Sequence, residues 1–395
     1  MPGRQSVIHT PEAAWGLQLR ERALAPPMEH DRPATLNWFR DHSPFYSDKI
    51  NTNQVWETIR PIEKQDVSDI PVAPDESIRA ARTSGTSGFQ VTIRNNTRER
   101  YFRRALLYRP QLFYALPDDV RQVVFVDGAW CAEVATPPKL FEYGGVRYQT
   151  WFVGVAADVG RIHSLLQSLR PHLIRGISSG IVRFIDQAGE SFHDLGVRYI
   201  APGGEFLQPE WRTAMQDAFA TTVLDRYGST ESGAIAWQCP FCNRYHANAD
   251  EIIIEPDPDG LLVTPLFVSS QPLLRYRLGD IVSIDESVAD CRIRLPTITL
   301  QQARRDDWVI GSDGKRVSPL SFQFEQVPHL DAWRLHQSSD GSLCLYFEST
   351  QPDIVAKQLG NRLADVVPNR PYKLQQGLWR LKREGKFKRV SSDLA

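Results

Sequence analysis

The sequence of 395 residues has no long apolar run and no excess of charge of either sign. Its 46 basic residues nearly balance 47 acidic ones, which gives a formal net charge of −1. Such a balance provides no electrostatic footprint for nucleic acid or for an anionic membrane surface. No apolar stretch approaches the roughly 18 residues that a membrane-spanning helix needs. We therefore expect neither a nucleic-acid partner nor a membrane partner.

Cysteine is also scarce, because five residues are too few for a disulfide scaffold in a chain of this length. The first residues, Met1 to Ser6, lack the apolar segment of a secretory signal peptide. Both absences favour a cytoplasmic protein. Two of the cysteines nevertheless stand as Cys239-x-x-Cys242 and are followed by His246, so this cluster needs its own explanation.

The hydrophobic content of 42% and the charged content of 24% are ordinary for a soluble globular protein of two or three domains. Between residues 120 and 230, short apolar runs alternate with segments of helical periodicity. This alternation predicts an α/β fold with a mostly parallel sheet that helices cover on both faces. From Glu251 onward, short apolar segments separated by turns predict a small antiparallel sheet or barrel.

The strand pattern is interrupted by a cluster of mixed charge, Ala303 to Asp307. We place a domain boundary there. The predicted domains are a large N-terminal domain at 1–303 and a small α+β domain at 304–395, which ends in a basic tail.

A loop rich in hydroxyl groups and glycine, Thr83-Ser84-Gly85-Thr86-Ser87-Gly88, precedes the strand-like alternation at 89–93. Glycine allows backbone turns in which successive N–H groups converge, so the loop is suited to hold a phosphate chain. It is not a Walker loop, because no Gly-Lys-Ser/Thr follows at the required spacing. Composition alone is equally consistent with a flexible Ser/Gly turn.

Five further motifs follow this loop along the chain. They are Gly203-Gly204-Glu205, Tyr227-Gly228-Ser229-Thr230-Glu231, Pro272 to Asp280, Ala303 to Asp307, and Gly385 to Val390. Together with the loop, they resemble, in order and at sensible distances, the motifs of the adenylate-forming enzymes. This superfamily includes acyl- and aryl-CoA synthetases, luciferases and peptide-synthetase adenylation domains. The chain looks most like the phenylacetate–CoA ligase branch, and the match runs from about Pro61 to Val390.

The resemblance implies an ATP- and Mg²⁺-dependent ligase that adenylates a small carboxylic acid and passes the acyl group to a thiol. The thiol would belong to coenzyme A or to the phosphopantetheine arm of a carrier protein. The loop at 83–88 would hold the β- and γ-phosphates. The resemblance also implies that Gly203, Gly204, Glu205 and Tyr227 bind adenine and that Gly228 and Ser229 contact the nucleotide. Thr230 would bind the α-phosphate, Glu231 would bind Mg²⁺, and Asp280 and Arg304 would bind the ribose. Lys386 would bridge carboxylate and phosphate oxygens.

Each of these residues also has a structural interpretation. Asp280 could cap a turn, Tyr227 could belong to the core, and Glu231 and Lys386 could be solvated charges. The chain also departs from the family pattern, since Phe89-Gln90 replaces the usual Lys-Pro and Ala303 replaces the hinge glycine. An alanine there would stiffen the domain rotation that the family uses between its two half-reactions.

The sequence does not identify the acid or the acceptor, and it leaves open whether the protein forms a homodimer. Aromatic residues where the resemblance places the acyl pocket suit an aryl or hydrophobic acid, whereas Asp127 would suit an amino acid; the aromatic residues are Phe125, Trp130, Tyr148 and Trp151. The same resemblance admits enzymes that transfer the acyl group to a protein. A different class of function is a non-catalytic, zinc-stapled binding protein of the same fold.

The segment Cys239-x₂-Cys242-x₃-His246 has a spacing that presents three ligands to one tetrahedral ion. Cys291 would complete a closed Cys₃His site, which predicts a structural Zn²⁺ ion in the segment 239–291. Similar clusters occur in some members of the branch that the chain resembles. Free thiols are the alternative, and a redox role is less favoured because no helix N-terminus follows to lower a thiol pKa. Cys131 and Cys344 are expected in the core.

Overall fold

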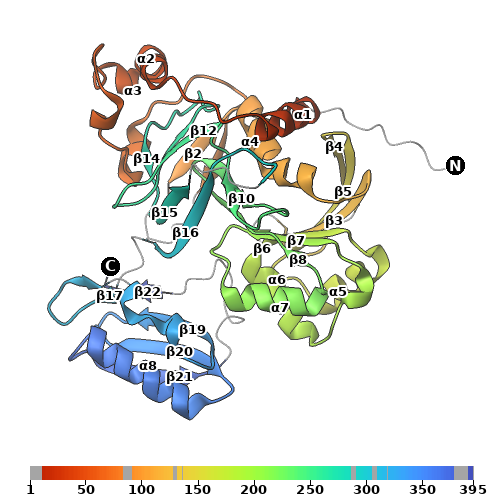
Figure 1. Ribbon diagram of the computed structural model, residues 1–395, viewed down its shortest axis with the longest axis vertical. Coiled ribbons are helices and arrows are strands. Elements are labelled where there is room, and N and C mark those ends of the chain that lie inside the picture. The colour runs from red at the N-terminus through yellow and green to blue at the C-terminus, as the bar shows by residue number, and fades with distance from the viewer. Residues whose placement is uncertain are drawn as a thin grey trace.

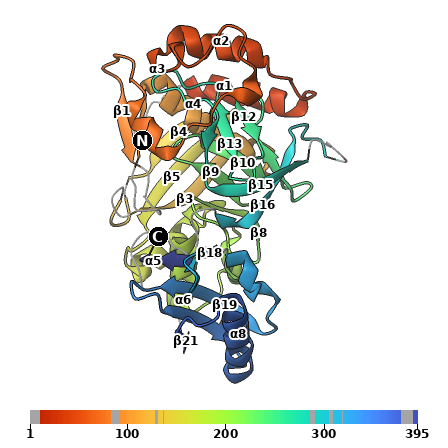
Figure 2. The same ribbon diagram turned by 90° about the vertical axis from the view of Figure 1, so that its left-hand side faces the viewer.

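The computed structural model describes residues 11–82, 91–127, 131–135, 137–285, 291–304, 309–317, 319–377 and 390–394. Figures 1 and 2 show a large body built from the N-terminal three quarters of the chain, with the blue C-terminal part beneath it. No helix among these residues is both long and apolar enough to cross a membrane.

In the described part of the large body, eleven strands form one sheet. They are β3 (Asp119–Val126), β4 (Lys139–Tyr143), β5 (Val146–Gly154), β6 (Leu173–Ile177), β7 (Tyr199–Gly203), β8 (Thr222–Val223), β9 (Arg226–Ser229), β10 (Gly233–Gln238), β11 (Tyr245–Ala247), β15 (Asp280–Asp285) and β16 (Thr297–Arg304). The order is β15-β16-β11-β10-β9-β7-β6-β3-β5-β4, with β8 beside β7. The central strands β5, β3, β6, β7 and β9 run parallel, which confirms the predicted α/β sheet.

Helices cover both faces of the parallel strands (Figure 1). One face packs on the amphipathic helices α5 (Val159–Leu169), α6 (Ser178–Ala188) and α7 (Pro209–Phe219), with η4 (His193–Leu195) nearby. The other packs on α1 (Pro11–Leu24), α4 (Thr97–Tyr108) and η3 (Arg109–Phe113). Helix α4 begins at a capping box in which Asn96 and Glu99 bond to each other's backbone N–H groups. Because α4 is fixed at this end, its side chains are positioned over the sheet.

A second core joins the N-terminal helices to the small antiparallel elements. The helices are α2 (Arg32–His42), α3 (Pro44–Ser47), η1 (Trp56–Thr58) and η2 (Lys64–Asp69). The strands are the hairpin β1 (Arg79–Arg82) with β2 (Thr92–Asn95), and the sheet of β12 (Ile252–Glu255), β13 (Leu262–Pro265) and β14 (Tyr276–Arg277). The predicted antiparallel sheet after Glu251 is therefore confirmed.

The C-terminal part has a hydrophobic core of its own. Its elements are β17 (Val309–Ile310), β18 (Arg316–Val317), η5 (Pro319–Phe322), η6 (Phe324–Gln326), β19 (Leu330–Gln337), β20 (Leu343–Ser349), α8 (Pro352–Val366), β21 (Tyr372–Gln376) and β22 (Val390–Ser392). Helix α8 packs on a sheet of order β21-β20-β19-β22. Strand β16 runs through Ala303 to Arg304, and the domain division at 303/304 stays a prediction.

Candidate functional site

The turn after β9, which contains Thr230 and Glu231, is held from behind by Arg103 of α4. The Arg103 guanidinium donates to the Glu231 carbonyl oxygen from Nη1 at 3.0 Å and from Nη2 at 2.9 Å. Its Nη2 also donates to the carbonyl oxygen of Thr230. Within the turn, the backbone N–H of Ser232 donates to Ser229 Oγ at 3.0 Å. The backbone of the predicted core motif is therefore fixed from both sides.

Glycine at position 228 is required by the approach of two strands. A Cβ atom on Gly228 would lie 2.3 Å from the carbonyl oxygen of Gly233 on the neighbouring strand β10. Real Cβ atoms do not tolerate such a contact, so β9 could not approach β10 with a larger residue there. The glycine of the core motif thus has a structural role beside its predicted role at the nucleotide.

Two hydrogen bonds join two of the predicted motifs, Tyr227 to Glu231 and Pro272 to Asp280. The hydroxyl of Tyr227 on β9 donates to Asp280 Oδ2 on β15 at 2.8 Å. The hydroxyl of Tyr276 on β14 donates to Glu231 Oε1 at 3.1 Å. Asp280 also lies opposite Arg304 in the ladder between β15 and β16. The residues predicted for adenine, ribose and Mg²⁺ therefore meet at one place, although they are distant in the sequence.

Arg103 is a residue of this site that the sequence motifs do not indicate. Burial lowers its pKa to about 10, against the opposing effect of the carboxylates of Glu231 and Glu99. Glu99 is itself buried and accepts from the backbone N–H groups of Ser269 at 2.6 Å and Ser270 at 2.8 Å. The available signal was the spacing of Glu99 and Arg103, which places both on one face of α4.

The predicted adenine motif lies at the carboxyl end of β7. Gly203 pairs with Arg226 at the start of β9, and Gly204 has a φ of +82°, in the left-handed region that favours glycine. The Glu205 carboxylate accepts from the backbone N–H of Ser179 at 2.9 Å and from its hydroxyl at 3.1 Å. Glu205 therefore fixes this loop to the N-terminus of α6, and its contact with adenine stays a prediction.

Two predicted elements lie outside the described residues: the loop from Thr83 to Gly88 and Lys386. The strands that flank the loop are described. They form an antiparallel hairpin in which Arg82 lies opposite Thr92. Ile93 of this hairpin packs in the same core as Tyr276. The loop therefore connects the two strands of a hairpin that packs in the same core as β14, the strand that carries Tyr276.

The described aromatic residues among those expected around the acid do not line one pocket. Phe125 and Trp151 pack with α5, α6 and α7 on one face of the sheet. Tyr148 packs in the core on the opposite face. Trp130 lies outside the described residues. The expectation of a shared aromatic pocket is therefore wrong, because alternate residues of a strand point to opposite faces.

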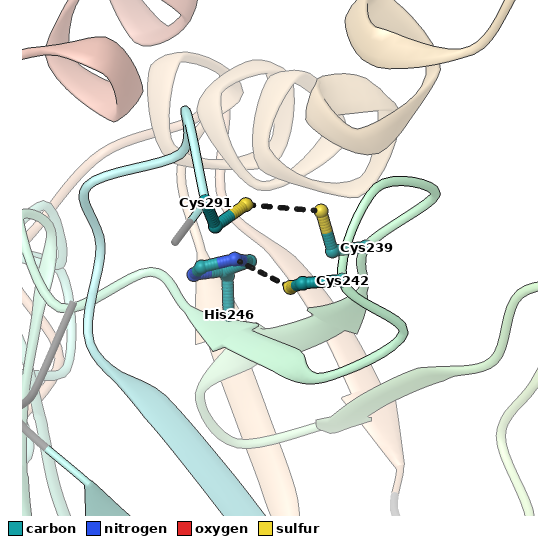
Figure 3. A group of neighbouring side chains, drawn as sticks. All are labelled: Cys239, Cys242, His246 and Cys291. Carbon is teal, nitrogen blue, oxygen red and sulfur yellow. Dashed lines mark hydrogen bonds between the residues drawn. The ribbon is translucent and has the colours of Figure 1, made fainter. Parts of the chain in front are cut away.

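The predicted Cys₃His cluster is assembled (Figure 3). Cys239 and Cys242 lie in the turn after β10, His246 lies on β11, and Cys291 precedes β16. One donor atom from each residue lies within 4.8 Å of the others. The two sulfur atoms of Cys239 and Cys291 are 3.7 Å apart, and Cys242 Sγ lies 3.4 Å from His246 Nε2. All five cysteines of the chain are free.

These distances fit the edges of a tetrahedron around one zinc ion. A Zn–S bond of about 2.3 Å gives a sulfur–sulfur edge of about 3.8 Å. His246 Nδ1 lies 2.7 Å from the carbonyl oxygen of Leu295, which only accepts, so Nδ1 carries the proton and Nε2 offers its lone pair. Burial raises the pKa of Cys239 to about 12 and also raises that of Cys291. A cation at the centre would offset this cost of thiolate formation.

No family model and no curated protein matches the chain, but solved structures do. One is 2-hydroxyisobutyryl-CoA ligase in the postadenylation state with R3-HIB-AMP, which is 17% identical, with 97% of this chain and 91% of that chain covered and a TM-score of 0.69. The same ligase with 2-HIB-AMP and CoA in the thioesterification state is 16% identical, with 98% and 91% covered and a TM-score of 0.57. ATP-bound MatB from Rhodopseudomonas palustris is 16% identical, with 79% and 65% covered and a TM-score of 0.50.

At these identities the likeness establishes the fold. The chain has the fold of the adenylate-forming enzymes, as its motifs predict. Over nearly equal coverage, it superposes better on the postadenylation state of the ligase than on the thioesterification state. The assignment to the phenylacetate–CoA ligase branch stays a prediction.

Proposed function

We propose that the protein is a cytoplasmic, ATP- and Mg²⁺-dependent carboxylate ligase. It forms an acyl-adenylate and then a thioester. The observation that carries this proposal is the pair of hydrogen bonds from Tyr227 to Asp280 and from Tyr276 to Glu231. They bring together the residue types that an adenine ring, a ribose and a metal ion need. The structural neighbours with bound acyl-AMP, CoA and ATP support the same activity.

The nucleotide binds along the carboxyl ends of the central strands, where open α/β sheets bind ligands. The ring of Tyr227 stacks on adenine, and its bond to Asp280 fixes the orientation of both side chains. Asp280 accepts from the ribose hydroxyl groups. Thr230 donates to the α-phosphate, and the loop at 83–88 holds the β- and γ-phosphates.

The metal site of the nucleotide is built around Glu231. This side chain is buried, and its carboxylate is oriented by the Tyr276 hydroxyl group. An oxygen ligand of this kind suits Mg²⁺. When bound, the ion neutralises negative charge on the phosphates. Arg103 positions the backbone that carries Thr230 and Glu231.

The reaction has two steps. A carboxylate oxygen attacks the α-phosphorus of ATP, the bond to the β-phosphate oxygen breaks, and pyrophosphate leaves. The thiolate of coenzyme A then attacks the acyl carbonyl carbon, and AMP leaves. The first step is catalysed mainly by positioning and electrostatic stabilisation. Lys386, carried by a domain at 304–395 that moves relative to 1–303, bridges the carboxylate and phosphate oxygens. A carrier-protein thiol and a protein side chain are the alternative acceptors.

The Cys₃His cluster binds one structural Zn²⁺ ion. Its four ligands leave no open position, which is typical of structural zinc rather than catalytic zinc. The ion ties the turn between β10 and β11 to the segment before β16. These strands belong to the half of the sheet that carries Asp280, so the zinc supports the nucleotide site without joining the reaction.

The proposed function is tested by following the oxygen atoms. Acids of a panel are labelled with ¹⁸O in both carboxylate oxygens and incubated with the protein, ATP, Mg²⁺ and coenzyme A. Adenylation predicts one ¹⁸O atom in the AMP that is released, together with pyrophosphate and an acyl-CoA. Label in inorganic phosphate with release of ADP would contradict adenylation. ATP binding without any AMP formation would favour the non-catalytic alternative.

A further inference from the structure

Two arginine residues of the sheet, one buried and one partly buried, each have two buried guanidinium nitrogens without a hydrogen-bond partner among the described residues. Arg175 on β6 has 5% of its surface exposed, and Arg226 begins β9. In the part of the chain that the structure describes, Nε and Nη1 of both guanidinium groups have no hydrogen-bond partner. A buried charge without a partner is costly, so chains usually avoid one or hold a ligand there.

The two arginine residues lie beside the same residue of the neighbouring strand β7. Arg175 lies opposite Ala201 in the ladder between β6 and β7. Arg226 Nη2 donates to the carbonyl oxygen of Ala201 at 2.9 Å. Arg226 also pairs with Gly203, and its Nε lies 3.8 Å from the place where a Cβ on Gly203 would be. The arginine pair therefore lies directly beside the glycine motif of the nucleotide site.

Further polar groups on this face of the sheet are also unpaired. The Arg175 guanidinium lies over the ring of Tyr108, 4.1 Å from its centre. Among the buried side-chain atoms without a partner in the described part of the chain are Tyr114 Oη, Tyr148 Oη, Gln122 Oε1 and both polar atoms of Gln111. Two of these hydroxyl groups lie close enough to the arginine residues to feel their charge. Burial raises the pKa of Tyr114 and of Tyr148. The charges of Arg226 and Arg175 oppose this rise at Tyr114, and the charge of Arg175 opposes it at Tyr148.

The described residues supply little negative charge to this layer. Burial, and next the positive charge of Arg175, lower the pKa of Arg226 to about 10, and Asp225 is the acidic residue that acts against them. Asp225 is bonded elsewhere, to the Tyr245 hydroxyl at 2.7 Å and to the backbone N–H of Arg226 at 2.8 Å. Burial also raises the pKa of Asp225 to about 6. Two guanidinium charges thus face at most one carboxylate charge.

We propose that Arg175 and Arg226 bind a second anionic group of the acid substrate, distant from the carboxylate that is adenylated. The simplest substrate of this class is a dicarboxylic acid. This inference rests on the proposed function and names the substrate class of the same site. Guanidinium groups bind a carboxylate through paired, charge-assisted hydrogen bonds, and tyrosine hydroxyl groups add donors. An acid with an apolar end would leave both charges unpaired, so the site rejects it.

The test compares matched acids in ATP–pyrophosphate exchange. The pairs are hexanedioate with hexanoate and terephthalate with 4-methylbenzoate. We expect kcat/KM to be about 100-fold or more higher for the dianionic member of an accepted pair, the scale on which a polar site rejects an analogue without the polar group. Arg175→Met lowers exchange with the dicarboxylate by about 100-fold, and the KM for ATP stays unchanged. Arg183→Met serves as the control. Arg183 lies on α6 and donates to the carbonyl oxygen of Val155, so it is not part of the proposed anion site. We expect this variant to keep the wild-type preference for the dicarboxylate.

Folding is checked in the same variants. Removing Arg175 leaves no protein acceptor unpaired, so the unfolding temperature without ligand stays equal to or above that of the wild type. Equal kcat/KM values for both members of each pair would overturn the inference and leave the proposed function intact. If no acid supports exchange, the proposed function fails. The inference is then decided by whether hexanedioate or terephthalate stabilises the wild type against heat but not Arg175→Met: stabilisation supports the anion site, and its absence overturns it.

Discussion

Two buried arginine residues of this protein have opposite surroundings. Arg109 is fully buried and donates to the carbonyl oxygen of Leu19, to Asn248 and, through two nitrogens, to Asp250. Arg175 is almost as deeply buried, yet two of its nitrogens have no partner among the described residues. The first region is completed by the chain itself and is structural. The second is completed only by something that binds, and this difference locates a ligand site.

The Cys₃His cluster resembles the second region, because four metal-ligating atoms converge on one point and only weak sulfur hydrogen bonds join them. We expect about one zinc ion per chain, and the largest loss of stability when it is removed. A site with free zinc about 10⁴-fold above its Kd stabilises the fold by about 5 kcal/mol. Metal analysis measures the zinc content, and thermal unfolding measures the stability. Both are carried out on the wild type, on Cys291→Ser and on Cys344→Ser as a control. If the wild type were fully folded without metal, the convergence of three cysteine residues and one histidine would not indicate a metal site in this protein.

Breaking the completed region should cost nearly as much. Arg109→Met leaves the Asp250 carboxylate buried without its partner and is expected to lower the free energy of unfolding by about 4 kcal/mol. Denaturant unfolding measures the change. Arg109→Met combined with Asp250→Leu removes both charges and should recover part of the loss. If Arg109→Met were as harmless as Arg175→Met, the contrast between the two regions would have no physical meaning.

A pH dependence sharpens the same comparison, since a second carboxylate of the Arg109 region, Glu251, lies beside Asp250 and is paired with Arg22. Burial and the neighbouring Asp250 raise the pKa of Glu251 to about 7. A raised folded-state pKa favours folding at low pH, so stability is lost as the pH rises through about 7. We expect a decrease of about 2 kcal/mol between pH 5 and pH 8. Glu251→Gln should flatten this slope, whereas an unchanged slope would assign the effect to other groups.

Arg103 is an intermediate case, because its donors are taken by the backbone of the site itself. Arg103→Lys keeps the charge beside Glu231 and Glu99 but replaces the rigid planar fork that reaches both carbonyl oxygens with a single compact ammonium group. We expect kcat for adenylation to fall by about 10-fold, which is about 1.4 kcal/mol, with the KM for ATP little changed. Steady-state kinetics measure both constants. A large rise in KM with unchanged kcat would mean that Arg103 acts in binding rather than in positioning the turn.

Much of the fold and of the site follows from the sequence alone. The alternation of apolar runs with helical segments predicts the parallel sheet. The order of the motifs predicts that Tyr227, Glu231 and Asp280 belong to one site, which the structure brings together. The spacing of the cysteines and His246 predicts their cluster. These features are local patterns, so a single sequence contains them.

What the sequence hides depends on which face of a strand a residue occupies and on its distant partners. The run Val123-Val124-Phe125-Val126 is apolar throughout, as in strands buried on both faces, so it does not reveal that Phe125 faces away from Tyr148. Arg103 bonds to residues more than 120 positions away. Arg175 stands in an ordinary strand, and only its missing partners distinguish it from Arg109.

The central claim is that the site around Glu231 adenylates a carboxylic acid. ATP–pyrophosphate exchange with Mg²⁺ and without a thiol tests it most directly, with wild-type protein and Glu231→Gln measured over monocarboxylic and dicarboxylic acids. The account predicts exchange with at least one acid, and a loss of about 10²–10³-fold in Glu231→Gln, the scale of losing one electrostatic contact of the transition state. ATP binding without exchange for any acid, or equal exchange in the variant, would contradict it.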